Sequence, residues 1–298
     1  MDIKHLALEA LDAATSTDPA VTYADTRVME IRDRQVSTKN GKAGHVSSGV
    51  SMGLAIRVLA HGCWGFAATD DLTRDGIHAA AALALDIARA GTLAKKHDVT
   101  LAPEQKYEAE WVSPIRIDPF TVPVDRNVAL LLDIDRELRR NPGVTLAEGS
   151  MTFERRRQVF ASSLGSLIDQ TRYLSGVGYA ALAYKDGEIQ KRSYPNSFGG
   201  QHQLKGYELI DEWDLLANAP RIAEEAVALH SADQCPEGEF DPRAEHNSRP
   251  AARQPRGHQT SRLSRAATRF SHPHLAEPLH QNIQICLSGS LLEVVVHP

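Results

Sequence analysis

The residues best suited to metal chemistry are three histidines near the C-terminal end, His272, His274 and His280. Imidazole is a common ligand of zinc and copper, so this group could form part of a metal site. Pro273 prevents a helical presentation of the first two, and a structural zinc site needs a fourth ligand that the spacing does not supply. We therefore expect this segment to be unstructured rather than a metal centre.

Other familiar catalytic signatures are missing from the sequence. No histidine is followed by glutamate, which excludes H-E-x-x-H, and there is no Walker loop, G-x-S-x-G or C-x-x-C. Cys63 could be a nucleophile, but beside Trp64 at a turn it is better explained as a partly buried structural thiol. Asp70 and Asp71 could bind a cation, but capping of the following helix explains them. The sequence thus offers no catalytic, cofactor-binding or metal-binding residue.

Two further groups of residues could contact an anion or a nucleotide. Arg155-Arg156-Arg157 is most simply interpreted as the solvated end of a hairpin, with an anion site as the alternative. Gly176 and Gly178 form a Gly-x-Gly pair inside a strand pattern. This context indicates a bulge or the close approach of another backbone rather than a dinucleotide loop.

Composition places the chain among soluble globular proteins, with 42% hydrophobic and 24% charged residues and a net charge of -5. The negative charge does not favour nucleic acid or an anionic membrane as a partner. No apolar run approaches the length of a membrane span and the N-terminus lacks the order of a signal peptide, so we expect a cytoplasmic protein. Three scattered cysteines, Cys63, Cys235 and Cys286, do not form a disulfide framework.

Residues 1–120 are predicted to form an α+β domain, a helix-flanked antiparallel sheet. Apolar residues at helical spacing predict a helix from Ile3 to Ala14, and Asn40-Gly41 is a strong hairpin signal. Residues 50–60 alternate as a strand, and a second helix is expected after Thr73 with Ile77, Ala81, Ala84 and Ala88 facing inward. The weak pattern from residue 91 to 121 indicates a connecting segment.

Residues 121–241 are predicted to form a strand-rich middle domain with flanking helices. A helix is expected after Pro123, and Asn141-Pro142-Gly143 should end it. Residues 144–194 then form strands with turns near Gly165 and Gly187, and a last helix is expected over residues 219–231.

The composition changes abruptly after Asp241. All nine lysines lie at or before Lys205, and residues 242–282 contain seven Arg, five His and five Pro. Residues 1–241 carry 26 basic and 35 acidic groups, whereas residues 242–298 carry 7 and 3. We expect 242–298 to be a disordered tail, produced by a frameshift or truncation near codon 241; a genuine divergent terminus is the alternative.

Several segments, taken together, resemble one known family. They are Tyr23–Val28, Asn40-Gly41, Val46–Gly49, Met52–Val58, Gly62–Thr69, Glu154–Ser163 and Gly206-Tyr207-Glu208. In order and content they are similar to the TldD/PmbA family, also called modulators of DNA gyrase, and the match covers residues 5–241. The resemblance implies a cytosolic zinc metallopeptidase that acts on peptides as a homo- or heterodimer with a TldD/PmbA-type paralogue.

The resemblance also says where the zinc ligands of such a protein would lie. In the metal-bearing type, a segment like Pro236–Asp241 leads into a strand and then a helix with H-E-x-x-x-H, whose histidines hold zinc together with a later cysteine. The resemblance here stops at Asp241, so none of these ligands can be carried over to this sequence. We therefore expect a metallopeptidase-family chain without the zinc-binding domain and without activity of its own.

Two other functions are compatible with the same residues. The chain could be a non-catalytic partner subunit that shapes the peptide chamber of an active paralogue. It could also be a peptide-binding scaffold that uses exposed sheet edges for strand addition. In each case a peptide is the expected ligand and nucleic acid is not.

Overall fold

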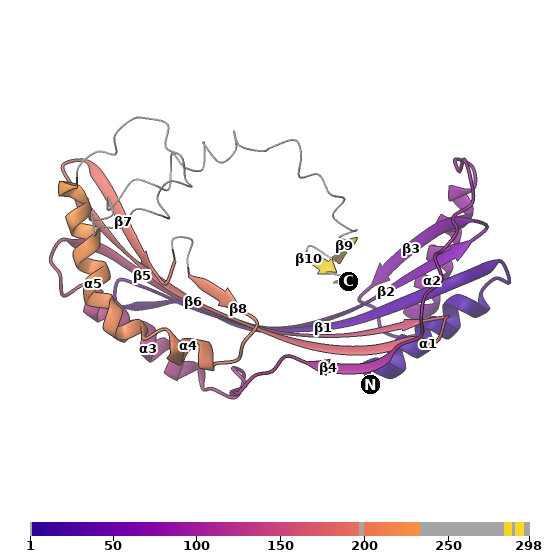
Figure 1. The fold of residues 1–298 in the computed structure, drawn as a ribbon, viewed down its shortest axis with the longest axis horizontal. Coiled ribbons are helices and arrows are strands. Elements are labelled where there is room, and N and C mark those ends of the chain that lie inside the picture. The colour runs from indigo at the N-terminus through magenta and orange to yellow at the C-terminus, as the bar shows by residue number, and fades with distance from the viewer. Residues whose placement is uncertain (1, 197–199, 233–282, 288–289, 295–298) are drawn as a thin grey trace, which may run out of the picture.

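The computed structural model describes residues 2–196, 200–232, 283–287 and 290–294. Most of them form one curved eight-stranded sheet with helices on its outer side, so that the molecule is a crescent (Figure 1). The strand order is β3-β2-β1-β5-β6-β4, and β7 and β8 also pair with β6. All these pairs are antiparallel except β4 with β6. The α+β class predicted from the sequence is confirmed.

The elements of the crescent have the following bounds. The strands are β1 (Val21–Lys39), β2 (Lys42–Ala60), β3 (Cys63–Thr69), β4 (Glu108–Val112), β5 (Val144–Ser162), β6 (Leu167–Lys185), β7 (Glu188–Tyr194) and β8 (Gln201–Gln203). The helices are α1 (Ile3–Ser16), α2 (Arg74–Gly91), α3 (Val124–Leu138), α4 (Glu208–Glu212) and α5 (Leu215–Ala228), followed by a 3-10 turn, η1 (Leu229–Ser231).

Four strands, β1, β2, β5 and β6, have 19 residues each. At the usual rise per residue, each spans about 60 Å, long enough to take part in both halves of the crescent. Two-residue turns join β1 to β2 and β2 to β3, and their first residues, Asn40 and His61, both have positive φ. Positive φ at both turn residues matches the right-handed twist of the flanking strands, so the hairpin predicted at Asn40-Gly41 is confirmed.

The sheet carries two hydrophobic cores on its helix-bearing face. The first lies under α1 and α2 and includes Leu6, Ile56 and Ile77, which are at most 2% exposed. The second lies under α3, α4 and α5 and includes Phe153 and Leu131. Strand β5 contributes to both cores, and so does β1, because each strand takes part in both halves of the crescent. The predicted domain boundary between residues 120 and 121 stays a prediction.

Three local expectations are corrected by the structure. The connecting segment 91–121 contains a strand, β4, which lies parallel to β6 at the sheet edge. Arg155-Arg156-Arg157 is in the middle of β5 instead of at a hairpin end, because β5 extends to Ser162. The last helix, α5, begins at Leu215, earlier than predicted, and tolerates Pro220 within its first turns.

Of the predicted disordered tail, 242–298, the structure describes one antiparallel hairpin of β9 (Ile283–Leu287) and β10 (Ser290–Val294). The rest of that segment lies outside the described residues. Among the helices that the structure describes, none has the length and hydropathy needed to cross a bilayer.

Candidate functional site

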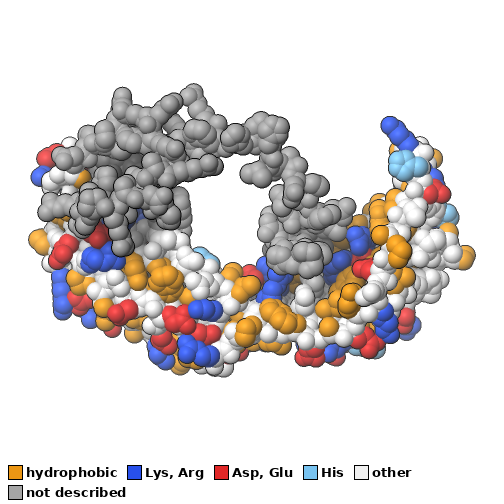
Figure 2. Space-filling model, in the orientation of Figure 1, with side chains coloured by type: hydrophobic (Ala, Val, Ile, Leu, Met, Phe, Trp, Pro, Cys, Tyr) orange, Lys and Arg blue, Asp and Glu red, His pale blue; other side chains and the backbone are white. Residues whose placement is uncertain are grey.

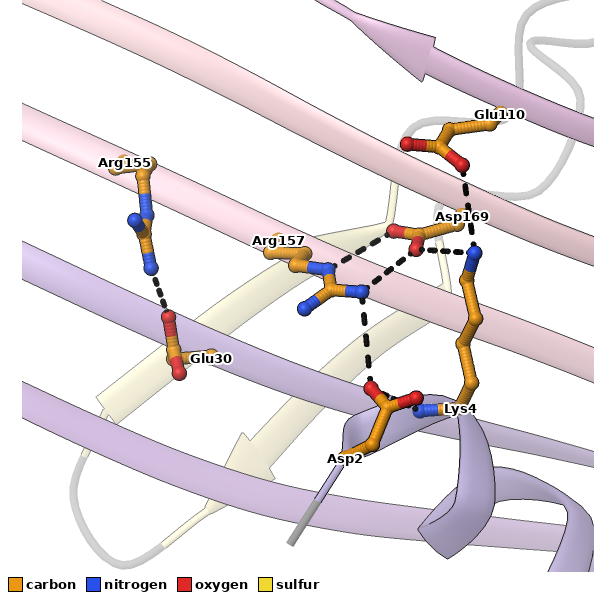
Figure 3. Close-up of polar contacts among 7 residues, drawn as sticks. All are labelled: Asp2, Lys4, Glu30, Glu110, Arg155, Arg157 and Asp169. Atoms are coloured by element: carbon orange, nitrogen blue, oxygen red, sulfur yellow. Dashed lines mark hydrogen bonds and ion pairs between the residues drawn. The ribbon is translucent and has the colours of Figure 1, made fainter. Parts of the chain in front are cut away.

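A belt of charged side chains separates the two cores on the helix-bearing face. We define this polar belt by six residues: Lys4, Glu30, Glu110, Arg155, Arg157 and Asp169 (Figure 3). Strand pairing brings them together, because Glu30 of β1 is opposite Arg157 of β5 and Glu110 of β4 is opposite Asp169 of β6.

The centre of the polar belt is the pair of Arg157 and Asp169. Arg157 donates from Nε to Oδ1 at 3.1 Å and from Nη2 to Oδ2 at 2.8 Å, a bidentate arrangement. Lys4 Nζ lies 3.3 Å from Asp169 Oδ2 and 3.4 Å from Glu110 Oε2. The Arg157 guanidinium, with help from Lys4, holds the pKa of the Asp169 carboxyl below its ordinary value.

The contacts of the polar belt point to a structural role. Arg155 is paired with Glu30, and Asp2 at the start of α1 caps Lys4 and lies 3.9 Å from Arg157. The belt therefore fastens the N-terminus of α1 to β4, β5 and β6 where the two cores part. The outer rim of the crescent shows the same intermixing of acidic and basic groups (Figure 2).

A second charged group lies on the opposite, inner face of the sheet. Asp25 is fully buried and accepts hydrogen bonds from Arg27 Nη1 at 2.5 Å and from Arg57 Nε at 2.8 Å. The odd-numbered residues of β1 face this side, since its even-numbered residues Ala24 and Val28 lie in the first core. One carboxylate thus serves two guanidinium groups and leaves one positive charge in excess.

Aromatic rings frame this group. The guanidinium of Arg57 stacks over Trp64 at 4.6 Å from its centroid, and that of Arg27 over Phe160 at 4.8 Å. Tyr23 packs edge-on against Trp64 with centroids 5.8 Å apart. Burial, together with the charge of Asp25, raises the pKa of the Tyr23 phenol. We call these six residues, Tyr23, Asp25, Arg27, Arg57, Trp64 and Phe160, the inner-face cluster.

The inner-face cluster is suited to binding rather than to bond cleavage. Its six residues include no cysteine, serine or threonine that could act as a nucleophile and no histidine that could act as its base. Its guanidinium and aromatic surfaces can contact carboxylates, carbonyls and apolar side chains of a ligand. All six residues lie in the segments that resemble the family, but the sequence did not predict that they meet, because their meeting depends on the pairing of β1 with β2 and β5.

The motif Gly206-Tyr207-Glu208 forms a structural clamp. Glu208 accepts backbone hydrogen bonds from Arg116, Ile117 and Gly206 at 3.0–3.2 Å. Tyr207 is buried and stacks on Phe153. Burial of Glu208 opposes its ionisation, but the backbone N–H groups outweigh this and lower the pKa of the carboxyl. The motif thus holds the segment before α3 against α4.

The other residues singled out from the sequence have structural roles where they are described. Cys63 is a buried free thiol, as predicted. Asp71 accepts from the backbone N–H of Thr73, the N-cap of α2, so capping explains it. A Cβ at Gly176 would lie 2.1 Å from the imidazole ring of His202 on β8, so the group that approaches this glycine closely is a side chain rather than the predicted backbone.

The described residues do not fit a zinc site. Within them, no group of three or more His, Cys, Asp or Glu side chains is arranged to hold a metal ion. The histidines considered from the sequence, His272, His274 and His280, lie outside the described residues. Zinc chemistry therefore cannot be assigned to any residue that the structure places.

Comparison with protein families identifies the chain. Residues 24–88 match the model of PmbA/TldA metallopeptidase domain 1, and residues 117–232 match the PmbA/TldA metallopeptidase central domain. The chain belongs to the PmbA/TldD metallopeptidase family, as its sequence motifs predicted.

Individual relatives agree with this placement. A metalloprotease of Methanothermobacter thermautotrophicus is 30% identical over 227 residues, which is 74% of this chain and 46% of the relative. The fold is similar to that of a protein described as a modulator of DNA gyrase from Thermotoga maritima, with a TM-score of 0.62 and 15% identity, over 80% of this chain and 50% of that one. A protein described in the same way from Bacteroides thetaiotaomicron has a TM-score of 0.61 and 13% identity, over 76% and 49%. The chain thus spans about half the length of the relatives that it matches.

Proposed function

We propose that the crescent is a non-catalytic, peptide-binding part of a PmbA/TldD-type metallopeptidase. The observation that carries this proposal is the inner-face cluster, which offers guanidinium and aromatic contacts in a chain of a peptidase family. In the proposal, the peptide lies along the inner face. Zinc ligands, and with them hydrolysis, come from residues other than those described here.

The contacts of Arg57 support binding of a peptide by this face. Its guanidinium is held between the carboxylate of Asp25 and the ring of Trp64, so little side-chain entropy is lost when a ligand binds. Arg57 remains 25% exposed, and its strand neighbour Phe66 is 37% exposed. A peptide carboxylate or carbonyl could therefore reach the guanidinium while an apolar side chain covers the ring of Phe66.

Peptide affinity tests the binding part of the proposal. Fluorescence anisotropy with labelled, unstructured acidic peptides should show saturable binding to the full chain, weakened about tenfold by Arg57→Gln. The matched control is Arg136→Gln on α3, which removes an exposed, ion-paired arginine from the helix-bearing side. Equal affinity of the wild type and Arg57→Gln would refute a role for the inner face.

Metal analysis and a peptidase assay test the non-catalytic part. The purified chain should contain no stoichiometric zinc and should not hydrolyse peptides, and adding a family paralogue that carries H-E-x-x-x-H should restore hydrolysis. One zinc per chain together with zinc-dependent hydrolysis by the chain alone would overturn this part.

A further inference from the structure

A pair of arginines lies on the inner face of the sheet, away from the inner-face cluster. Arg172 of β6 is opposite Arg156 of β5, which in turn is opposite Ile31 of β1. Ile31 is an odd-numbered residue of β1, so all three side chains lie on the inner face. Two like charges placed directly opposite each other repel and lower the stability of the folded chain.

The charge of Arg172 is not balanced by a neighbour. Among the residues that the structure describes, none is joined to its side chain by a hydrogen bond or an ion pair. The nearby carboxylate of Glu154 is bound by Arg156 at 3.0 Å, and Asp33 lies opposite Glu154 on β1, so that β5 separates it from Arg172. Burial of the half-buried Arg172, together with the charge of Arg156, lowers the pKa of its guanidinium. An anion at this position would relieve the repulsion.

An exposed aromatic ring accompanies Arg172. Trp111 of β4 is opposite Gln170 of β6 and is 44% exposed. It faces the inner side of the sheet, because its neighbour Glu110 belongs to the polar belt on the other face. Trp111 and Arg172 are therefore diagonal neighbours on adjacent strands, close enough for one ligand segment to contact both.

The distance between Arg172 and Arg57 is one that a short peptide can span. Arg57 is opposite Asp25 of β1, whereas Arg172 is level with Ile31, further along the same strand. The offset corresponds to about 20 Å along the strands and about 14 Å across them, or about 25 Å between the two backbone positions. An extended peptide covers this distance with about seven residues. Arg57 also has an exposed ring beside it, that of Phe66.

We propose that Arg172, next to the positive charge of Arg156, is a second carboxylate-binding subsite of the inner face. The preferred ligand is then an extended peptide with two acidic side chains about seven residues apart, one bound at Arg57 and one at Arg172. The ligand supplies the counter-charge that the described residues do not supply to Arg172. The inference rests on the peptide-binding role proposed above and names the class of peptide.

Peptides that differ only in their acidic residues test the subsite. Fluorescence anisotropy compares three labelled, C-terminally amidated peptides, with two glutamates about seven residues apart, with two glutamates close together, and with a single glutamate. The wild-type chain should bind the first about tenfold more tightly than the other two. Arg172→Gln should remove this advantage and leave the affinity for the single-glutamate peptide within about twofold of the wild type. Arg136→Gln, on the helix-bearing side, is the control and should retain the advantage.

Thermal unfolding of the free protein is a second test, which involves no peptide. Arg172→Gln removes the repulsion between two opposite arginines, so its melting temperature should equal that of the wild type or exceed it by up to about 3 °C. An arginine with a structural role would give the opposite result. A lower melting temperature of Arg172→Gln would therefore overturn the proposal.

The binding results separate this inference from the proposed function. Equal affinity of the wild type for the two peptides with two glutamates would overturn the inference, and so would an advantage that survives Arg172→Gln. In either case, a loss of affinity in Arg57→Gln would still support the peptide-binding role. Failure of all three peptides to bind to the wild type would overturn both.

Discussion

Arg157 of β5 and Asp169 of β6 are diagonal neighbours on adjacent strands and are joined by two hydrogen bonds, of 3.1 and 2.8 Å. The carboxylate is 5% exposed, whereas the guanidinium is one-third exposed. The pair stands at the point where one hydrophobic core ends and the other begins. Its contribution to stability can therefore be measured apart from core packing.

Arg157→Gln should reduce the free energy of unfolding by about 1–3 kcal/mol, because it leaves a nearly buried carboxylate with Lys4 as its remaining basic partner. Urea unfolding at neutral pH measures the change. Arg136→Gln removes an exposed arginine paired with Asp133 and should cost less than about 0.5 kcal/mol. Equal effects of the two substitutions would contradict a special role of the polar belt.

Asp169 should also shape the acid sensitivity of the protein. Its pKa is lower in the folded chain than its ordinary value of 3.8, so the unfolded chain binds more protons between these two values. The stability from this group is present above about pH 4 and is lost as pH falls through the folded pKa. In unfolding measurements from pH 2 to 6, Asp169→Asn should have a lower stability at neutral pH and a shallower acid slope. Parallel curves for the two proteins would show that this carboxyl is not involved.

Glu208→Gln should weaken the clamp between α4 and the segment before α3. The amide supplies one acceptor oxygen where the carboxylate supplies two, so a backbone N–H of Arg116, Ile117 or Gly206 loses its partner. We expect a loss of about 1–3 kcal/mol in thermal or urea unfolding. Glu224→Gln, on the exposed side of α5, is the control and should change little. A neutral result at Glu208 would mean that the segment is held by other contacts.

Gly65→Ala should be among the costlier small substitutions in the first core. A Cβ at Gly65 would lie 1.8 Å from the carbonyl oxygen of Ala84, a backbone atom of α2 that cannot move aside alone. We expect a loss of at least about 1–3 kcal/mol, measured by urea unfolding. Gly91→Ala, whose Cβ would lie 3.3 Å from Cys63 Cβ, is the milder comparison. Equal stability of both variants would mean that α2 can shift away from β3.

The hairpins and most helices of the crescent are predictable from the sequence because their signals are local. Asn40-Gly41 fixes a turn by its backbone preferences, and Thr73 caps α2 three residues before the N–H that it binds. The strand β4 could not be predicted in this way. All its residues are exposed, so no alternation of apolar and polar side chains marks it, and its partner β6 lies far along the chain.

The grouping of charged residues in the crescent could not be predicted from the sequence, because it depends on how the strands are aligned. Arg155, Arg156 and Arg157 are adjacent in sequence, but the pleat sends the first and third to the polar belt and the second to the inner face. Asp25 meets Arg57 only when β1 and β2 are aligned. The family resemblance marks these residues but does not explain them, because their spacing in the sequence does not predict which of them meet in the fold.

Strand β5 completes the first core with Val159 and Ala161, which lie opposite Val28 and Thr26 of β1. When the ribosome has synthesised α1, the first hairpins and α2, the first core therefore still lacks the residues that β5 contributes. More than half of the chain must be synthesised before β1 can pair fully with β5, and pairings between segments so far apart in sequence form slowly. The N-terminal segment should accordingly depend on chaperones during synthesis more than its helices and tight turns suggest.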